Sequence, residues 1–232
     1  MRMNALRFLI GTTRARCLAL ASSLAWASLA GCADTSPECR DLLAQAHERA
    51  EAGNLDAQFK LGQMYEHGEC VAVDMQAAAK WYRQAADSGH AGAQKVLGFM
   101  YAGGVGLEED TKQAVYWFRK AAEQGHPEAQ VGLGIAYLRG IGVPQDLDEA
   151  TRWLRRSAEQ GFARGQFNLG HSYETGQGVP QDYVQAYMWY KLAAGRYPKA
   201  DRALKRLAET MTPQAVEKGN RLAKDWNEAA VD

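Results

Sequence analysis

Apolar residues recur along most of this chain with the spacing of helical faces. Ala57, Leu61 and Tyr65 stand four residues apart, so they form one stripe along a helix. Asp74 is placed to cap a second helix, and Gly89 to end it. Between them lies a second stripe with helical spacing: Ala78, Trp81, Tyr82, Ala85 and Ala86. The pattern predicts a hairpin of two short helices.

The hairpin pattern occurs four times when the chain is laid on itself at a shift of 36 residues. The positions that repeat include a tyrosine, an aspartate and a tryptophan: Tyr65, Tyr101, Tyr137 and Tyr173; Asp74, Asp110, Asp146 and Asp182; Trp81, Trp117, Trp153 and Trp189. One hairpin cannot bury its stripes alone, whereas stacked copies can, with the tryptophans in the core. We therefore expect an all-α fold, a right-handed superhelical solenoid of antiparallel helical hairpins.

The turn between the two helices is rich in glycine and proline. It reads GIGVPQD from Gly140 to Asp146 and GQGVPQD from Gly176 to Asp182. Glycine lets the first helix end in a left-handed residue, proline restricts φ, and aspartate caps the next helix. A phosphate-binding loop would be needed once and would be followed by Lys-Ser or Lys-Thr, which is absent here. The turn is therefore predicted to be a structural corner.

The unit from Pro127 to Phe162, PEAQVGLGIAYLRGIGVPQDLDEATRWLRRSAEQGF, resembles the Sel-1-like repeat, a relative of the tetratricopeptide repeat with a longer turn. The Leu-Gly-x-x-Tyr signature, the period and the turn sequence carry this resemblance. It covers four repeats, at 56–90, 91–126, 127–162 and 163–195. Outside them we expect an N-terminal capping helix at 39–55 and C-terminal capping helices at 196–232, the last of which starts at Thr212-Pro213.

The first 32 residues have the composition of a targeting segment. Four arginines and no acidic residue precede the stretch CLALASSLAWASLAGC, which is apolar but short for a membrane span. Its end, Leu29 to Cys32, resembles the bacterial lipoprotein box. The resemblance implies a signal peptide at 1–31, lipidation of Cys32, a linker at 32–38 and a lipid-anchored protein facing the periplasm. Ala33 after the cysteine favours the outer membrane; the alternative is an ordinary cleaved signal that leaves Cys32 free.

Charge and histidine placement bear on the class of ligand. Beyond residue 32 the chain carries 23 basic and 27 acidic side chains, and such a mildly acidic body argues against nucleic-acid binding. His67 and His171 lack a second ligand at metal spacing, so we expect neither a metal nor a cofactor. His90 and His126 follow the glycine that ends a second helix, which predicts a role in a turn.

The sequence gives little support to an enzymatic function. Some disulfide-rich relatives are described as binding or hydrolysing β-lactams, and this resemblance makes a β-lactam or cell-wall hydrolase the alternative function. However, Ser-x-x-Lys and Gly-x-Ser-x-Gly motifs are both absent. A ligand-sensing domain is a third hypothesis. We expect a non-catalytic scaffold that binds a protein or peptide.

Two cysteines remain once Cys17 leaves with the signal peptide and Cys32 is lipidated. Cys39 and Cys70 would then lie in an oxidising compartment, in adjacent turns of the stacked array. We predict a Cys39–Cys70 disulfide that closes a loop of about 30 residues and contributes roughly 3 kcal/mol in the chain-entropy model.

The candidate binding surface comes from positions that differ between repeats. Positions 59, 63 and 66 and their counterparts lie on one face of the first helix, away from the repeated stripe. First helices line the concave side in tetratricopeptide-like arrays, which makes this face a candidate for recognition; packing between repeats is the alternative. We name the following residues the first-helix column: Phe59, Gln63, Glu66, Lys95, Phe99, Ile135, Leu138, Phe167, His171 and Glu174.

Overall fold

The computed structural model describes residues 36–229, which belong to one compact unit and contain eleven α-helices and no strand. The first helices of the four hairpins are α2 (Leu55–His67), α4 (Ala91–Gly103), α6 (Pro127–Arg139) and α8 (Ala163–Thr175). The second helices are α3 (Met75–Asp87), α5 (Thr111–Glu123), α7 (Leu147–Glu159) and α9 (Tyr183–Ala193). The remaining helices are α1 (Pro37–Glu51), α10 (Pro198–Thr210) and α11 (Pro213–Ala229).

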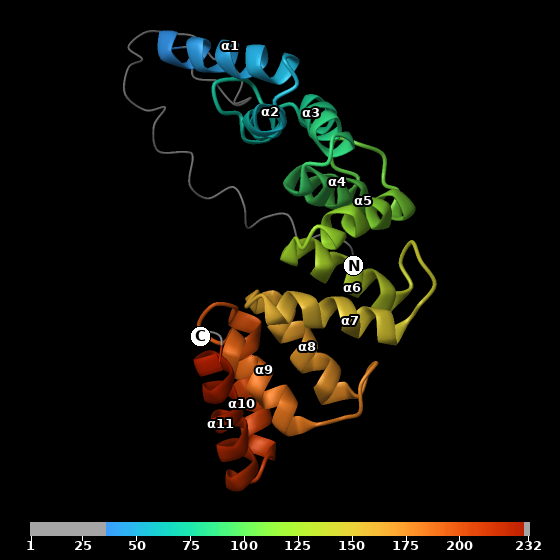
Figure 1. Ribbon diagram of the computed structural model, residues 1–232, viewed down its shortest axis with the longest axis vertical. Coiled ribbons are helices and arrows are strands. Elements are labelled where there is room, and N and C mark those ends of the chain that lie inside the picture. Colours follow the sequence, from blue (N-terminus) through green and yellow to red (C-terminus); the bar gives the residue numbers. More distant parts are fainter. Residues whose placement is uncertain (1–35, 230–232) are drawn as a thin grey trace, which may run out of the picture. The chain divides into compact units, whose positions relative to one another are not determined.

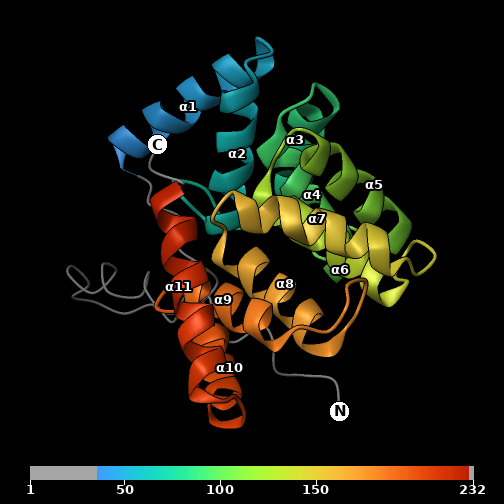
Figure 2. The ribbon, with the colours of Figure 1, turned by 60° about the horizontal axis from the view of Figure 1, so that its bottom comes forward.

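Consecutive helices pack against each other from α1 to α9 (Figure 1). Each first helix contacts its own second helix and the second helix of the preceding hairpin, as in a solenoid. The last helix departs from this order, because α11 packs against α9, as α10 also does (Figure 2). The predicted all-α solenoid of helical hairpins is confirmed.

The corner between the helices is built as its sequence predicts. Each first helix ends at a left-handed glycine, with φ between 62° and 72° at Gly68, Gly104, Gly140 and Gly176. The side chains of Asp74, Asp110, Asp146 and Asp182 accept hydrogen bonds from the first N–H groups of the following helix. Local chemistry therefore fixes where each first helix stops and where the second helix of the hairpin starts.

A second glycine of this corner makes contact with the preceding repeat. Gly142 has φ 72°, and a Cβ built on it would lie 2.3 Å from the carbonyl oxygen of Thr111, the first residue of α5. Gly106 and Gly178 approach Met75 and Leu147 in the same way. A side chain at this position would push neighbouring repeats apart.

Two polar bridges, each recurring at a fixed separation, connect one hairpin to the next. Arg119 Nη2 donates to the Tyr137 hydroxyl at 2.7 Å, and Arg155 Nη2 to that of Tyr173 at 3.0 Å. Arg83 donates to Tyr101 in the same way. At the start of the array His47 takes the arginine's place, with its Nε2 3.2 Å from the Tyr65 hydroxyl. The repeated tyrosine therefore serves stacking as well as core packing.

The second bridge uses the repeated, buried glutamine of the first helix. Gln94 Nε2 donates to the carbonyl of Ala86 at 3.0 Å, which satisfies the end of the preceding helix. Its Oε1 accepts from Gln124 Nε2 at 2.7 Å. Gln130 makes the corresponding pair of bonds, and Gln166 accepts from Arg196 at 2.9 Å.

The tryptophans lie mostly in the core. Trp117, Trp153 and Trp189 are 2–8% exposed, whereas Trp81 in the first repeat is half-buried. The structural role predicted for this position therefore holds in the three later repeats and only partly in the first.

Boundaries at the N-terminus differ from the sequence-based prediction. The capping helix begins at Pro37 rather than residue 39 and ends at Glu51 rather than residue 55, so the end of the predicted linker 32–38 is helical. Ser36 causes the early start, because its side chain accepts from the N–H of Cys39 and proline follows directly. The predicted signal peptide and the lipidated Cys32 lie outside the described residues. Within residues 36–229 no helix has the length and hydropathy needed to cross a membrane.

Candidate binding face

The first-helix column lies on α2, α4, α6 and α8. Most of its side chains are partly buried and partly exposed to solvent. His171 is exposed, and the other nine residues are half-buried. Side chains in this state contact their own hairpin on one side and remain accessible on the other.

The phenylalanines of the column pack against an aromatic ring on the second helix of their own hairpin. The ring centroids are 4.9–5.5 Å apart in these pairs: Phe59–Tyr82, Phe99–Phe118 and Phe167–Tyr190. Ile135 borders the core cluster around Leu154 and Leu169. The apolar members therefore contribute to stability, which is the packing alternative left open by the sequence.

The rings reach this position because the first helix carries a glycine opposite each of them. A Cβ on Gly98 would lie 2.4 Å from the Phe118 ring, and one on Gly170 would lie 2.8 Å from the Tyr190 ring. Gly62 and Gly134 face Tyr82 and Leu154 in the same way. The glycine of the Leu-Gly signature therefore allows the close approach of the two helices that its spacing predicts.

Two acidic members of the column accept hydrogen bonds from buried tyrosines. The Tyr82 hydroxyl donates to Glu66, and the Tyr190 hydroxyl donates to Glu174 at 2.6 Å. Burial, together with the bond to the carboxylate and its negative charge, raises the pKa of both tyrosines well above the ordinary value. The hydroxyls therefore stay protonated and hold the carboxylates at the surface of the hairpin.

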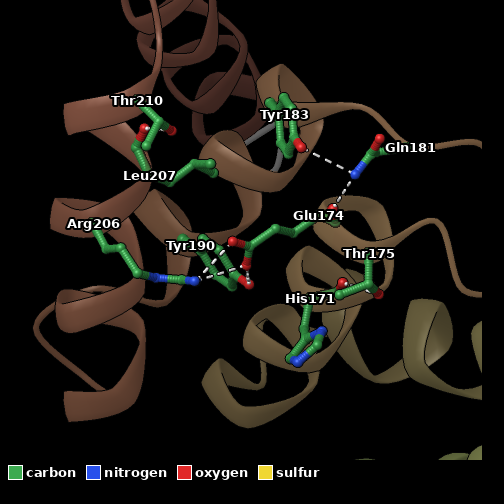
Figure 3. A network of polar contacts seen from close by, with 9 residues as sticks. All are labelled: His171, Glu174, Thr175, Gln181, Tyr183, Tyr190, Arg206, Leu207 and Thr210. Carbon is green, nitrogen blue, oxygen red and sulfur yellow. Dashed lines mark hydrogen bonds and ion pairs between the residues drawn. The ribbon is translucent and has the colours of Figure 1, made fainter.

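Glu174 also binds a cation from outside the repeats. Arg206 on α10 places Nη2 2.8 Å from Oε1 and 2.9 Å from Oε2 of Glu174 (Figure 3). The Glu174 side chain is 15% exposed, whereas that of Glu66 is 34% exposed. Sequence reasoning missed Arg206 because it lies in the segment where the repeat register fades.

The other polar members differ from repeat to repeat. Lys95 forms an ion pair with Glu128 of the next repeat at 3.3 Å. The His171 side chain is exposed, and the Gln63 and Leu138 side chains are half-buried. The face therefore presents a sequence of unlike groups along the array rather than one repeated contact.

The predicted histidine role can be located in detail. His90 is the N-cap of α4, where its Nδ1 accepts from the N–H of Ala93 at 3.0 Å, and His126 is the N-cap of α6 without a side-chain bond. Within residues 36–229 no three His, Cys, Asp or Glu side chains gather as a metal site requires.

Cys39 and Cys70 form a disulfide in the structure, with Cα atoms 5.0 Å apart. The two cysteines are 31 residues apart, the same separation as Thr111 and Gly142 in the close backbone contact of a later repeat. Cys70 takes the place of the second corner glycine, and its φ of 62° is the sole positive value for a non-glycine residue within residues 36–229. The disulfide thus replaces a glycine contact with a covalent bond between α1 and the first corner.

Two depressions lie away from the column. One, of about 390 Å³, lies between α1 and α2 and is lined by Leu42, Arg49 and Asp56 among others. The second, of about 550 Å³, borders the acidic turn at 108–110 together with Arg83 and Tyr101. No residue of the first-helix column lines either of them.

A family model for the Sel1 repeat matches residues 55–90, 91–126, 127–162 and 163–196. The chain belongs to the Sel1 repeat family. The matched ranges agree with the four predicted repeats to within one residue at either end. Sel1 repeat proteins generally mediate protein–protein interaction and are generally not catalytic.

Two solved structures resemble this Sel1 repeat protein over 80% of its length. One is a protective antigen present in uropathogenic Escherichia coli strains that displays an SLR fold, with 37% identity and a TM-score of 0.76; this chain spans 40% of the antigen. The other is a Sel1 repeat protein from Oxalobacter formigenes, with 33% identity, a TM-score of 0.69 and 74% of that chain covered. A comparison with curated proteins found no match.

Proposed function

We propose that this Sel1 repeat protein is a non-catalytic scaffold of the bacterial envelope that binds a protein or peptide partner across the first-helix column, on the concave side of the array. One observation supports the proposal most directly. Stacking residues recur in repeat after repeat, whereas the column presents Phe59, Lys95 and Phe167 at one equivalent position and remains half-exposed. Residues that differ while the scaffold repeats are free to match an extended partner.

The test is partner capture from membranes by the full-length, lipidated protein. The variant Gln63→Arg with His171→Glu changes two accessible column residues, and the control Gln76→Arg with Gln113→Glu makes matched charge changes at exposed positions of α3 and α5. We expect the column variant to lose the captured partner and the control to retain it. Equal capture by both variants would remove the column from partner binding.

The location in the envelope is a separate proposal that rests on the lipoprotein box. Lipid anchoring gains about 0.8 kcal/mol for each buried methylene, so removing the acylated cysteine should release the protein. We expect Cys32→Ser to abolish labelling by a fatty-acid analogue and to move the protein out of the membrane fraction. Unchanged labelling of the variant would exclude Cys32 as the lipidated residue.

A further inference from the structure

The helix α1 has the register of the second helix of a hairpin. Its buried Ala50 lies 36 residues before Ala86 of α3, and the carbonyl of each accepts from the buried glutamine of the next first helix. Three positions that a second helix turns toward its own first helix are buried in every complete hairpin: Ala78, Tyr82 and Ala85; Ala114, Phe118 and Ala121; Ala150, Leu154 and Ser157; Ala186, Tyr190 and Ala193. In α1 these positions hold Leu42, Ala46 and Arg49, and Leu42 is 44% exposed. Within residues 36–229 no first helix covers this face, which lines the depression of about 390 Å³ between α1 and α2.

The helix α10 has the register of a first helix and begins 35 residues after α8. Its N-cap residue Tyr197 contacts Phe167 with ring centroids 5.1 Å apart, as His90, the N-cap of α4, stacks on Phe59. The buried glycine of the Leu-Gly signature is replaced in α10 by Lys205, which is exposed. Because α11 packs against α9, no second helix within residues 36–229 covers Lys205. The described chain therefore has a second helix without a first at one end and a first helix without a second at the other.

The sizes of the facing side chains are reversed between the two end helices. Within a hairpin the first helix carries the small residue and the second helix the large one, so that a Cβ on Gly62 would lie 2.6 Å from the Tyr82 ring. At the ends the second helix carries the small residue, Ala46, and the first helix carries the large one, Lys205. A lysine can lay its methylene stem over an apolar surface and keep its ammonium group in water. The end helices are therefore complementary to each other in shape.

A pair of opposite charges occupies one contact point between these two faces. In repeat 1 the Cζ atom of Phe59 lies 3.4 Å from a Cβ built on Gly92, the second residue of α4. The residues that correspond to these two are Arg202 in α10 and Asp56 in α2. Arg202 is exposed, and the Asp56 side chain is 94% exposed although its Oδ1 lies 3.3 Å from His90 Nε2. An α10 helix from another molecule, placed on α1 and α2, would therefore bring Arg202 to the Asp56 carboxylate.

A second pair of opposite charges occupies another contact point. Within a hairpin Gln130 Oε1 of the first helix accepts from Gln160 Nε2 at the end of the second helix, at 2.8 Å. The counterpart of Gln130 in α10 is Asp201, and the counterpart of Gln160 lies one turn after Arg49. Arg49 is exposed, and so is Asp201, whose Oδ1 accepts from the N–H of Gly195. Each end therefore supplies one arginine and one aspartate, and each arginine meets an aspartate of the other end.

We infer that α10 of one copy packs against α1 and α2 of a second copy, which completes a hairpin from two molecules and joins the chains head to tail. The inference goes beyond the proposed function, because it uses the ends of the array and no residue of the first-helix column. The occupant is a copy of the same chain, because both halves of the contact, with their reversed sizes and opposite charges, are present in it. A contact between two different surfaces of one protein leaves one surface of each kind free, so further copies can add to the row.

The first test places the photo-crosslinking amino acid p-benzoylphenylalanine at position 42 of the full-length protein in membranes. We expect irradiation to join two copies, and mass spectrometry to locate the second attachment in α10. Position 116 is the matched control and should give no such product, since Tyr116 is 49% exposed and Leu42 is 44% exposed. Attachment of position 42 to a different protein, or the absence of a product that joins two copies, would overturn the inference.

Charge reversal tests the paired residues in the full-length protein in detergent. Association is measured by sedimentation at low ionic strength, because exposed charge pairs weaken with salt. Asp56→Arg and Arg202→Asp should each weaken association at least about tenfold, because each brings like charges together. An equimolar mixture of the two variants should associate again, since the reversed end of one then meets the reversed end of the other.

Recovery in the mixture keeps the result independent of folding. The matched controls are Asp148→Arg and Lys80→Asp, since Asp148 is the second residue of α7 as Asp56 is of α2, and Lys80 is exposed on α3. Both controls should associate like the unaltered protein. An unaltered protein that sediments as a single copy, equal weakening by the controls, or a mixture that stays dissociated would each contradict the head-to-tail contact.

Discussion

Single residues decide how closely neighbouring repeats approach. The second corner glycine is the clearest case, because it combines a left-handed conformation with a backbone contact that leaves no room for a side chain. Gly161 ends a second helix with a similar φ of 75°, but no atom lies within 4 Å of the position that a Cβ would take there. A side chain at Gly161 would meet only the strain of the left-handed backbone, whereas a side chain at Gly142 would meet that strain and a steric clash as well.

Alanine substitution at these glycines should give different losses. Gly142→Ala should lower the free energy of unfolding by about 2–5 kcal/mol, because it adds a clash with the Thr111 carbonyl to the left-handed strain. Gly161→Ala should cost only about 1–2 kcal/mol, the strain alone. Urea denaturation of the three proteins measures both values, and equal losses would contradict the proposed contact.

At the scale of elements, the capping helices differ in how they are attached. The helix α1 packs on α2 and is linked to the first corner through Cys39 and Cys70. The helix α10 is held without a covalent bond, by Leu207 in the core and by Arg206 on Glu174. The terminal hairpin at the N-terminal end is therefore covered by a helix held by a disulfide, and the one at the C-terminal end by a helix held by apolar packing and an ion pair.

Removal of the disulfide should show that it replaces a glycine contact. Cys39→Ser with Cys70→Ser should lower the free energy of unfolding by roughly 3 kcal/mol. Cys39→Met with Cys70→Gly copies the Met75–Gly106 pair of the next repeat, and it should recover about 1 kcal/mol because glycine adopts φ near 62° without strain.

Chemical denaturation of the mature protein and both variants measures these differences. A thiol titration of the denatured, unreduced protein should detect neither Cys39 nor Cys70. Two free thiols at these positions would refute the disulfide, and equal stability of the two double variants would refute its equivalence to the glycine contact.

At the scale of the whole array, stability is a sum over the hairpins and the contacts between them, and one polar contact within the hairpins is not made in all four. Gln94 and Gln130 each accept a bond from a glutamine at the end of a later helix, and Gln166 accepts one from Arg196. The equivalent partner of Gln58 is Ser88, which is too short, and Gln58 Oε1 is buried without a hydrogen bond from residues 36–229. The first repeat therefore lacks a hydrogen bond that the other three make between the first helix and the end of the second.

Completing this bridge should stabilise the protein. In Ser88→Gln the new amide is placed to donate to Gln58 Oε1, and we expect a gain of about 0.5–1.5 kcal/mol in the free energy of unfolding. Ser88→Ala is the control and should change stability by less than about 0.5 kcal/mol, because Ser88 is exposed. Thermal and urea unfolding measure the gain, and a Ser88→Gln protein no more stable than the control would exclude the bridge.

The sequence predicts much of the fold because the contacts are periodic. The partners of the buried glutamines lie 8 and 30 residues away and those of the tyrosines 18 residues away, so the same pairing recurs in successive repeats. The disulfide partner was predictable for the same reason, since Cys39 and Cys70 occupy the register of a repeated contact. The start of α1 was missed because the local cap at Ser36 lies outside this register.

The repeat period does not predict the contacts of the candidate binding face. Spacing alone identifies the residues on one face of the first helices, but not that Phe59 and Phe167 pack on buried tyrosines while staying accessible. Repeat period, helices, corners and caps were determined by the sequence, because each depends on local chemistry or a constant separation. Only the tertiary structure decided that α10 covers Tyr190 and places Arg206 on Glu174, because that contact joins the array to a segment outside the repeat.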